Sequence, residues 1–203
     1  MKAGLFDLDG VVFDTEPQYT IFWGGIFKEY YPGSEGMEQK IKGQTLVQIY
    51  DKYFPSKEDQ TSITARLNDY ERHMTYPYIA GFETFIKQLK ANGIPTAVAT
   101  SSNKDKMENV YRRHPEFKSY FDAILTSEDF AESKPSPDCY LRAAERLGAK
   151  PEDCVVFEDS FNGLKSGRAS GACVVGLATT NSAESIAPYC DEVIKDYENF
   201  SIK

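Results

Sequence analysis

The stretch Met1-Lys-Ala-Gly-Leu-Phe-Asp-Leu-Asp-Gly-Val-Val-Phe-Asp14 decides the fold of this chain. Residues 3 to 6 are small or apolar, and so short an apolar run is typical of a buried strand rather than a helix. Asp7 and Asp9 follow at once, and then Gly10, which allows the backbone to turn sharply. Carboxylates at the C-terminal end of a strand lie where α/β proteins bind ligands, so the pair predicts a functional site.

Two geometries are open for this acidic pair. Residues two apart share one face of a strand, so Asp7 and Asp9 would face one site if the strand continued. If the strand ends before them, the turn can still aim both carboxylates at one centre. The competing interpretation is a plain surface turn, because Asp-Gly is a common turn dipeptide.

The segment from 15 to about 76 has helical rather than strand patterns. Aromatic and aliphatic residues recur there at helical spacing, namely Tyr19, Phe22, Trp23, Ile26, Phe27 and Tyr30. Further helical patterns run over 37–54 and 57–74, and the next clear strand begins only at Ile94. That gap is too long for one connection inside a compact domain. We therefore predict an inserted helical cap domain over 15–76, with Gly33 and Gly36 in an exposed loop, and a core domain formed by 1–14 and 77–203.

Strand and helix patterns alternate from residue 77 onward. Strands are expected over 94–100, 123–126, 154–157, 172–177 and 192–194. Helices are expected over 82–92, from about 104 to 113, over 134–147 and after Asn162-Gly163. Such alternation predicts an α/β fold, a Rossmann-like and mostly parallel sheet covered by helices.

Composition excludes several classes of partner. Of 203 residues, 31 are acidic and 23 are Lys or Arg, giving a net charge of −8. This balance argues against nucleic acid and anionic membranes as partners. No apolar run is long enough to span a membrane, and the early strand leaves no room for a signal peptide. We expect a cytoplasmic monomer.

The four cysteines predict neither a metal site nor a disulfide framework. No two of them stand in a CxxC pair, and none lies beside clustered histidines. Cys154 and Cys173 lie in apolar runs, so we expect buried free thiols.

Polar side chains follow three of the predicted strands, and a lysine opens a nearby helix: Asp7, Asp9, Thr100, Ser101, Lys134, Glu158 and Asp159. The C-terminal ends of parallel strands lie on one edge of a sheet, so these groups should converge. Converging carboxylates repel one another unless a hard cation neutralises them, and oxygen ligands with spare water positions suit Mg²⁺. The lysine, a hydroxyl and backbone N–H groups would then form a cradle for a phosphoryl group.

These segments resemble the four motifs of the haloacid dehalogenase superfamily, which here read Asp7-Leu-Asp-Gly-Val11, Thr100, Lys134-Pro135 and Glu158-Asp-Ser160. Three longer segments are similar to the branch that contains β-phosphoglucomutase and many small-molecule phosphatases: Asp14-Thr-Glu16, Lys134-Pro-Ser-Pro-Asp138 and Glu158-Asp-Ser-Phe-Asn-Gly163. The resemblance spans the whole chain, and the helical insert matches the position of a mobile cap.

The resemblance implies roles for individual residues. Asp7 would be the nucleophile that forms an aspartyl-phosphate, and Asp9 the general acid and base. Thr100 and Lys134 would bind the transferring phosphoryl group. Asp7, Asp159 and the carbonyl of Asp9 would hold Mg²⁺, with Glu158 either a ligand or a support for the ligands. The substrate, a small phosphorylated metabolite, would meet Glu16, Ser101, Ser102 and Asn103.

Three other activities compete with a phosphatase. A dehalogenase expels halide and needs no proton donor, so Asp9 and the acidic pair Glu158-Asp159 argue against it. A phosphoaccepting signalling receiver is shorter, lacks an inserted domain and does not carry its phosphoacceptor after the first strand. A phosphomutase of the β-phosphoglucomutase kind is the closer rival. By resemblance it carries a cap histidine and a cap arginine where this chain has Tyr19 and, after Lys42-Gly43, Leu46, so we favour a phosphatase.

Overall fold

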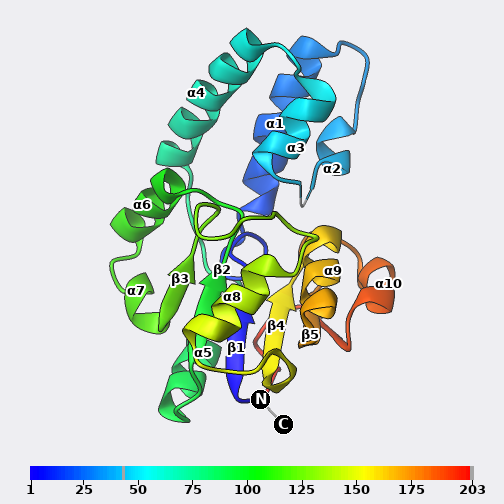
Figure 1. Cartoon of the computed structure of the whole chain (residues 1–203). Coiled ribbons are helices and arrows are strands. Elements are labelled where there is room, and N and C mark those ends of the chain that lie inside the picture. The colour runs from blue at the N-terminus through cyan, green and yellow to red at the C-terminus, as the bar shows by residue number, and fades with distance from the viewer. Residues whose placement is uncertain (43, 202–203) are drawn as a thin grey trace.

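The computed structural model describes residues 1–42 and 44–201, and Gly43 therefore lies outside the described residues. Within them, six strands form one sheet in the order β3-β2-β1-β4-β5-β6, and every pairing is parallel (Figure 1). The strands are β1 (Ala3–Phe6), β2 (Thr96–Ala99), β3 (Ala123–Leu125), β4 (Cys154–Glu158), β5 (Cys173–Leu177) and β6 (Glu192–Ile194). The predicted α/β class, a Rossmann-like parallel sheet, is confirmed.

The helices fall into two groups along the chain. The first group precedes β2 and comprises α1 (Glu16–Tyr30), α2 (Met37–Lys40), α3 (Leu46–Tyr53), α4 (Lys57–His73) and α5 (Phe82–Ala91). The second group alternates with the later strands and comprises α6 (Lys104–Arg113), α7 (Phe117–Tyr120), α8 (Asp138–Arg146), α9 (Phe161–Ser170) and α10 (Ala183–Ile186). Two single 3₁₀ turns, η1 (Pro151–Asp153) and η2 (Ala187–Tyr189), complete the described elements.

Helices cover both faces of the sheet, which explains why its strands read as continuous apolar runs. Neighbouring residues of β1 enter opposite layers. Phe6 packs in the cluster that contains α5, α6 and α7, where its ring stacks on Phe157 at 4.6 Å between centroids. Leu5 packs in the other cluster, with Tyr140 of α8 and Leu164 of α9. Burial on both sides fixes the central strands, and with them the residues that follow each strand.

Several element boundaries differ from the sequence expectation, each for a local reason. The strand expected from residue 94 begins at Thr96, because Pro95 lacks the N–H that a strand interior needs. The helix expected from Lys134 begins at Asp138, after Pro137. The single helical pattern over 37–54 divides into α2 and α3. Thr45 starts α3 with a capping box, accepting from the Gln48 N–H and donating its own N–H to the Gln48 side chain.

Helices α1 to α4 lie together beyond the C-terminal ends of the strands (Figure 1). They pack around an apolar cluster of their own, made by Trp23, Ile26, Phe27, Ile41, Ile49, Tyr50, Phe54, Ile63 and Leu67. The aromatic stripe of α1 contributes to this cluster as its spacing predicts, although Tyr19 also packs against the sheet layer. The strand ends therefore face a separately packed group of helices.

One expectation about the cysteines is wrong. All four are free thiols and Cys154 is buried, but Cys173 is exposed. Cys173 is the first residue of β5, and only the four residues after it in the strand are buried.

No helix among the described residues is long and apolar enough to cross a membrane.

Tyr197 carries a buried hydroxyl that has no hydrogen-bond partner among the described residues. Its ring stacks on Phe85 at 5.1 Å and meets the edge of Phe82, so the side chain is held by packing alone. Tyr76 is buried as well, but its hydroxyl donates to the main-chain carbonyl of Glu71 at 2.9 Å. The Tyr76 hydroxyl therefore has a hydrogen bond that the Tyr197 hydroxyl lacks.

Tyr197→Phe should therefore raise the free energy of unfolding by about 1 kcal/mol, because it removes an unsatisfied buried group. The matched change Tyr76→Phe should lower it by about 1 kcal/mol, since it leaves a buried carbonyl without its donor. Urea unfolding of both variants measures the two effects. A loss of stability in Tyr197→Phe as large as that in Tyr76→Phe would mean that the Tyr197 hydroxyl has a partner.

Candidate active site

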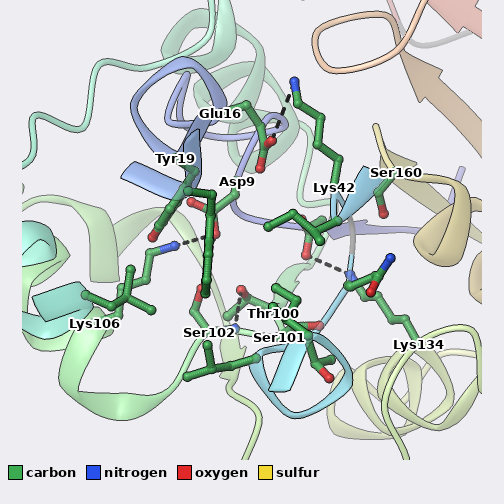
Figure 2. Close-up of a pocket in the computed structure, with 18 of the residues that line it drawn as sticks. Asp9, Glu16, Tyr19, Lys42, Thr100, Ser101, Ser102, Lys106, Lys134 and Ser160 are labelled. Atoms are coloured by element: carbon green, nitrogen blue, oxygen red, sulfur yellow. Dashed lines mark hydrogen bonds and ion pairs between the residues drawn. The ribbon is translucent and has the colours of Figure 1, made fainter. Parts of the chain in front are cut away.

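A cavity of about 190 Å³ lies between the C-terminal edge of the sheet and helices α1 to α4. All the side chains predicted for the site line it, namely Asp7, Asp9, Glu16, Thr100, Ser101, Ser102, Asn103, Lys134, Glu158 and Asp159. Figure 2 labels six of them: Asp9, Glu16, Thr100, Ser101, Ser102 and Lys134. They meet because β1, β2 and β4 end side by side. The Asp7 N–H donates to the Phe157 carbonyl at 3.1 Å, and the Thr100 N–H donates to the Leu125 carbonyl at 3.0 Å.

A buried lysine joins two of the carboxylates. Lys134 Nζ lies 2.7 Å from Asp7 Oδ1 and 2.6 Å from Glu158 Oε1, and its side chain is only 4% exposed. Burial alone would lower the pKa of Lys134, but Asp7 and Glu158 outweigh it and raise that pKa. Lys134 is therefore a permanent positive charge on the floor of the cavity.

Asp7, Glu158 and Asp159 form an acidic cluster in which one oxygen from each carboxylate lies within 4.8 Å of the others. Burial is the largest influence on Asp7 and raises its pKa to about 7, although Lys134 opposes the shift and Glu158 adds to it. Burial also raises the pKa of Asp159, and the neighbouring carboxylates act in the same direction. Carboxylate oxygens held this close to one another are the donor set that a hard divalent ion prefers.

Glu158 is the most fully engaged member of this cluster. Its Oε1 accepts from Lys134 and from the Tyr140 hydroxyl at 3.0 Å. Its Oε2 accepts from the N–H groups of Asp159 and Ser160 and from the Ser160 hydroxyl, at 2.9 to 3.1 Å. A side chain on Gly163 would come within 1.7 Å of Glu158 Oε1, so only glycine allows helix α9 to approach the carboxylate. Glu158 is thus held in one orientation.

The Asp9 carboxylate lines the same cavity but lies outside the close cluster of Asp7, Glu158 and Asp159. β1 ends at Phe6, and the chain beyond it no longer alternates as a strand. The Asp9 carboxylate instead accepts from Thr15 Oγ1 at 2.5 Å, Ser102 Oγ at 3.1 Å and Lys106 Nζ at 2.5 Å. The backbone turns at Gly10, whose φ of 72° favours glycine.

The segment after β2 supplies hydroxyl and amide groups. Thr100 is 1% exposed, and its Oγ1 accepts from the Ser102 N–H at 3.0 Å. Asn103 starts α6 by accepting from the Lys106 N–H at 2.9 Å, so its amide oxygen is already used. Ser101 and Ser102 also line the cavity beside Asp9 and Thr100 (Figure 2).

The helical wall carries further charged groups. Glu16 of α1 pairs with Lys42 at 4.0 Å. Burial, followed by repulsion from Asp9, raises the pKa of Glu16 to about 7, while Lys42 opposes the shift. Glu71 of α4 is 7% exposed and accepts from the Tyr19 hydroxyl at 2.8 Å. The helical wall therefore carries these two carboxylates, one paired with a lysine and one bound to a tyrosine hydroxyl.

Sequence reasoning missed Lys106, Glu71 and Tyr140. Lys106 is 4% exposed and packs its Nζ 4.7 Å from the centre of the Tyr19 ring, beside the carboxylate of Asp9. The one available signal is its place three residues after the Asn103 cap, because residues three apart share a helix face. No local pattern links Glu71 or Tyr140 to the site.

Comparison with known proteins identifies the family. A model described as haloacid dehalogenase-like hydrolase matches residues 5–177. A probable pseudouridine-5′-phosphatase of Saccharomyces cerevisiae is 32% identical over 200 residues, covering 86% of this chain and 81% of that protein. A bifunctional riboflavin kinase/FMN phosphatase of Arabidopsis thaliana is 30% identical over 205 residues, 96% of this chain, although the chain spans only 51% of its length.

A solved structure agrees with these sequence matches. The crystal structure of a HAD hydrolase, family IA, variant 3, from Entamoeba histolytica has a TM-score of 0.87 and 25% identity, and the match covers 100% of this chain and 96% of that one. The similarity thus includes the helices beyond the sheet as well as the sheet itself. Because the family model covers most of the sequence, the chain belongs to the family of haloacid dehalogenase-like hydrolases.

Proposed function

We propose that this protein is a magnesium-dependent phosphatase that hydrolyses a small phosphorylated metabolite through an aspartyl-phosphate on Asp7. One observation carries the proposal, the contact of Asp7 with Lys134 inside a buried acidic cluster at the sheet edge. The relatives named as phosphatases support the same reaction.

Asp7, Asp159 and the main-chain carbonyl of Asp9 would hold the magnesium ion, with Glu158 orienting its neighbours through the hydrogen bonds that its carboxylate accepts. Their fit rests on the donor set, because closely spaced carboxylate oxygens suit Mg²⁺. The bound ion would neutralise charge on the phosphoryl oxygens. Lys134 supplies a second positive charge on the same side, and Thr100 offers a hydroxyl.

The chain's own groups then divide the reaction into two transfers. A carboxylate oxygen of Asp7 attacks phosphorus, and Asp9 donates a proton to the leaving oxygen. Water next attacks the phosphorus of the aspartyl-phosphate, Asp9 accepts a proton from that water, and Asp7 is released with inorganic phosphate. The hydrogen bonds from Thr15 and Ser102 orient the Asp9 carboxylate for both proton transfers.

Residues 15–76 would act as a cap domain on a core formed by 1–14 and 77–203. Their separate apolar cluster and their place over the cavity support this division. Closure of such a cap would exclude bulk water from the reaction. Glu16, Gln44 and Thr45 would then contact the substrate, since all three line the cavity.

The residues at two positions of the cavity support hydrolysis rather than phosphoryl transfer to a second substrate. Tyr19 and Leu46 stand where the resemblance to phosphomutases calls for histidine and arginine, and both line the cavity. Neither His73 nor His114 is among the lining residues. His114 instead contacts Glu116 and the carbonyl of Tyr76.

Chelation should abolish turnover of an aryl phosphate, and added Mg²⁺ should restore it. Ca²⁺ should restore it poorly, because its larger and looser coordination would misplace the oxygens of Asp7. Asp159→Asn should raise the Mg²⁺ concentration needed for half-maximal activity by at least about tenfold. Asp105→Asn, an exposed change on α6, serves as the control. Full activity in chelator would exclude the magnesium assignment.

Asp7 should make the stability of the metal-free protein depend on pH. Its pKa rises from 3.8 to about 7 on folding, so the folded state binds more protons between these values. This stabilisation is complete below about pH 4 and is lost as the pH rises through about 7. In chelator, the wild type should therefore lose stability relative to Asp7→Asn as the pH rises from about 4 to about 7. The free energy of unfolding of Asp7→Asn minus that of the wild type should increase over the same pH range. Asp105→Asn should show no such trend, and a flat difference for Asp7→Asn would contradict the burial of Asp7.

The central pair can be tested with two amide variants. Asp7→Asn should abolish turnover, because an amide is a poor nucleophile. Asp9→Asn should slow turnover by about 10²- to 10⁴-fold, the usual value of general acid–base catalysis, and should let the aspartyl-phosphate accumulate with a good leaving group. Rapid quench followed by mass spectrometry would detect the aspartyl-phosphate.

In the wild type, inorganic phosphate should appear as fast as substrate disappears. Conversion of a sugar 1-phosphate to its 6-phosphate without free phosphate would instead identify a mutase.

A further inference from the structure

Lys106 places a buried ammonium group beside the carboxylate of Asp9, and no step of the proposed reaction uses it. Its side chain is 4% exposed, and its Nζ lies 2.5 Å from Oδ2 of Asp9 (Figure 2). Removing an ammonium group from water is strongly unfavourable unless a close partner compensates for the loss. Lys104, two residues earlier on the same helix, is exposed. The burial of Lys106 against Asp9 therefore indicates a role in holding this carboxylate.

Three donors from different parts of the chain fix the Asp9 carboxylate. Thr15 Oγ1 donates to Oδ1, whereas Ser102 Oγ and Lys106 Nζ both donate to Oδ2. Each hydroxyl has a single proton to donate and can rotate toward another acceptor. The ammonium is the charged donor of the three, and charge-assisted hydrogen bonds are about twice as strong as neutral ones. We therefore expect Lys106 to contribute most to the orientation of the carboxylate.

Lys106 is itself held from the helical side of the cavity. The Tyr19 ring lies against the ammonium, with 4.7 Å between Nζ and the centre of the ring. An ammonium group near an aromatic face is attracted electrostatically by the ring. The Tyr19 hydroxyl in turn donates to Glu71 of α4 at 2.8 Å, and α4 packs against α6. The ammonium therefore lies between the Asp9 carboxylate and a ring that is fixed at its hydroxyl end.

We propose that Lys106 is a positioning residue that holds the Asp9 carboxylate in the orientation needed for both proton transfers, and that the Tyr19 ring holds Lys106 in place. This role rests on the proposed phosphatase function and adds a residue to its machinery. Lys106 acts through Asp9 and takes no part in making or breaking bonds to phosphorus. Two other roles compete with this one: stabilisation of the fold alone, and direct binding of the substrate.

Two esters that differ in their need for a proton donor test the proposal. Phenyl phosphate has a poor leaving group that needs a proton, whereas 2,4-dinitrophenyl phosphate has a good leaving group that does not. Lys106→Met should lower kcat for phenyl phosphate by about 10²-fold, the loss that a misplacement near 1 Å can cause. The burst of dinitrophenol that accompanies formation of the aspartyl-phosphate should keep its wild-type rate. KM for both esters should change little.

Three further variants distinguish positioning from the competing roles. Lys104→Met is the matched control and should equal the wild type with both esters. Tyr19→Leu should lower kcat for phenyl phosphate by about tenfold, because the ammonium remains but loses the ring. If circular dichroism shows Lys106→Met to be unfolded, Lys106→Gln gives the same comparison, since it keeps a donor without the charge. An equal loss with both esters, or a rise in KM alone, would overturn the proposal.

A double-mutant cycle shows whether Lys106 acts through Asp9. In the Asp9→Asn background, Lys106→Met should cause no further loss of kcat for phenyl phosphate. Losses that multiply would overturn the proposal, because Lys106 would then act independently of Asp9. If the wild type hydrolyses neither ester, the phosphatase function fails and the positioning role fails with it. If the wild type hydrolyses both and Lys106→Met behaves as Lys104→Met does, the positioning role alone fails.

Discussion

The ion pairs of Lys134 are the constraint on which the site depends. One ammonium group touches two buried carboxylates from different strands, and without it Asp7 and Glu158 would repel each other in a place that water hardly reaches. The pairing brings the loop before α8 against the ends of β1 and β4. Asp159 adds a third carboxylate, so the cluster holds two more carboxylates than ammonium groups. The same arrangement brings oxygens of Asp7, Glu158 and Asp159 close enough together that they could hold a metal ion.

The parallel sheet provides the positional accuracy that this cluster requires. Both faces of the central strands are covered, so their register is fixed by packing on two sides. Residues that follow the strands inherit that register, which brings Asp7, Thr100 and Glu158 to one edge. Glu158 is then locked by donors from its own turn and by the close approach of Gly163. The sheet side of the cavity therefore carries groups whose positions are fixed by packing, and helices α1 to α4 supply the opposite wall.

Much of this could be predicted because its causes are local. The apolar run of β1, the alternation after residue 77 and the polar residues at strand ends all lie in short sequence windows. The parts that could not be predicted depend on contacts between distant segments. Apart from its place three residues after Asn103, nothing near Lys106 shows that it, and not Lys104, lies beside Asp9, because α4 and the Tyr19 ring complete that environment. The direction of the Asp9 carboxylate likewise depends on Thr15, Ser102 and Lys106 together. The exposure of Cys173 depends on where β5 meets the surface.

The separate apolar cluster of helices α1 to α4 has a consequence for the history of such proteins. Its buried side chains all come from residues 15–76, so substitutions at Glu38 and Leu46 on the cavity wall touch neither apolar cluster of the sheet. Glu38 and Leu46 can therefore be substituted while Asp7 and Lys134 keep their geometry. A duplicated gene could therefore acquire a new substrate through a few changes in one segment, with the inherited chemistry intact. Because the helices and the sheet have separate apolar clusters, related proteins are expected to diverge in substrate specificity while they keep the same fold.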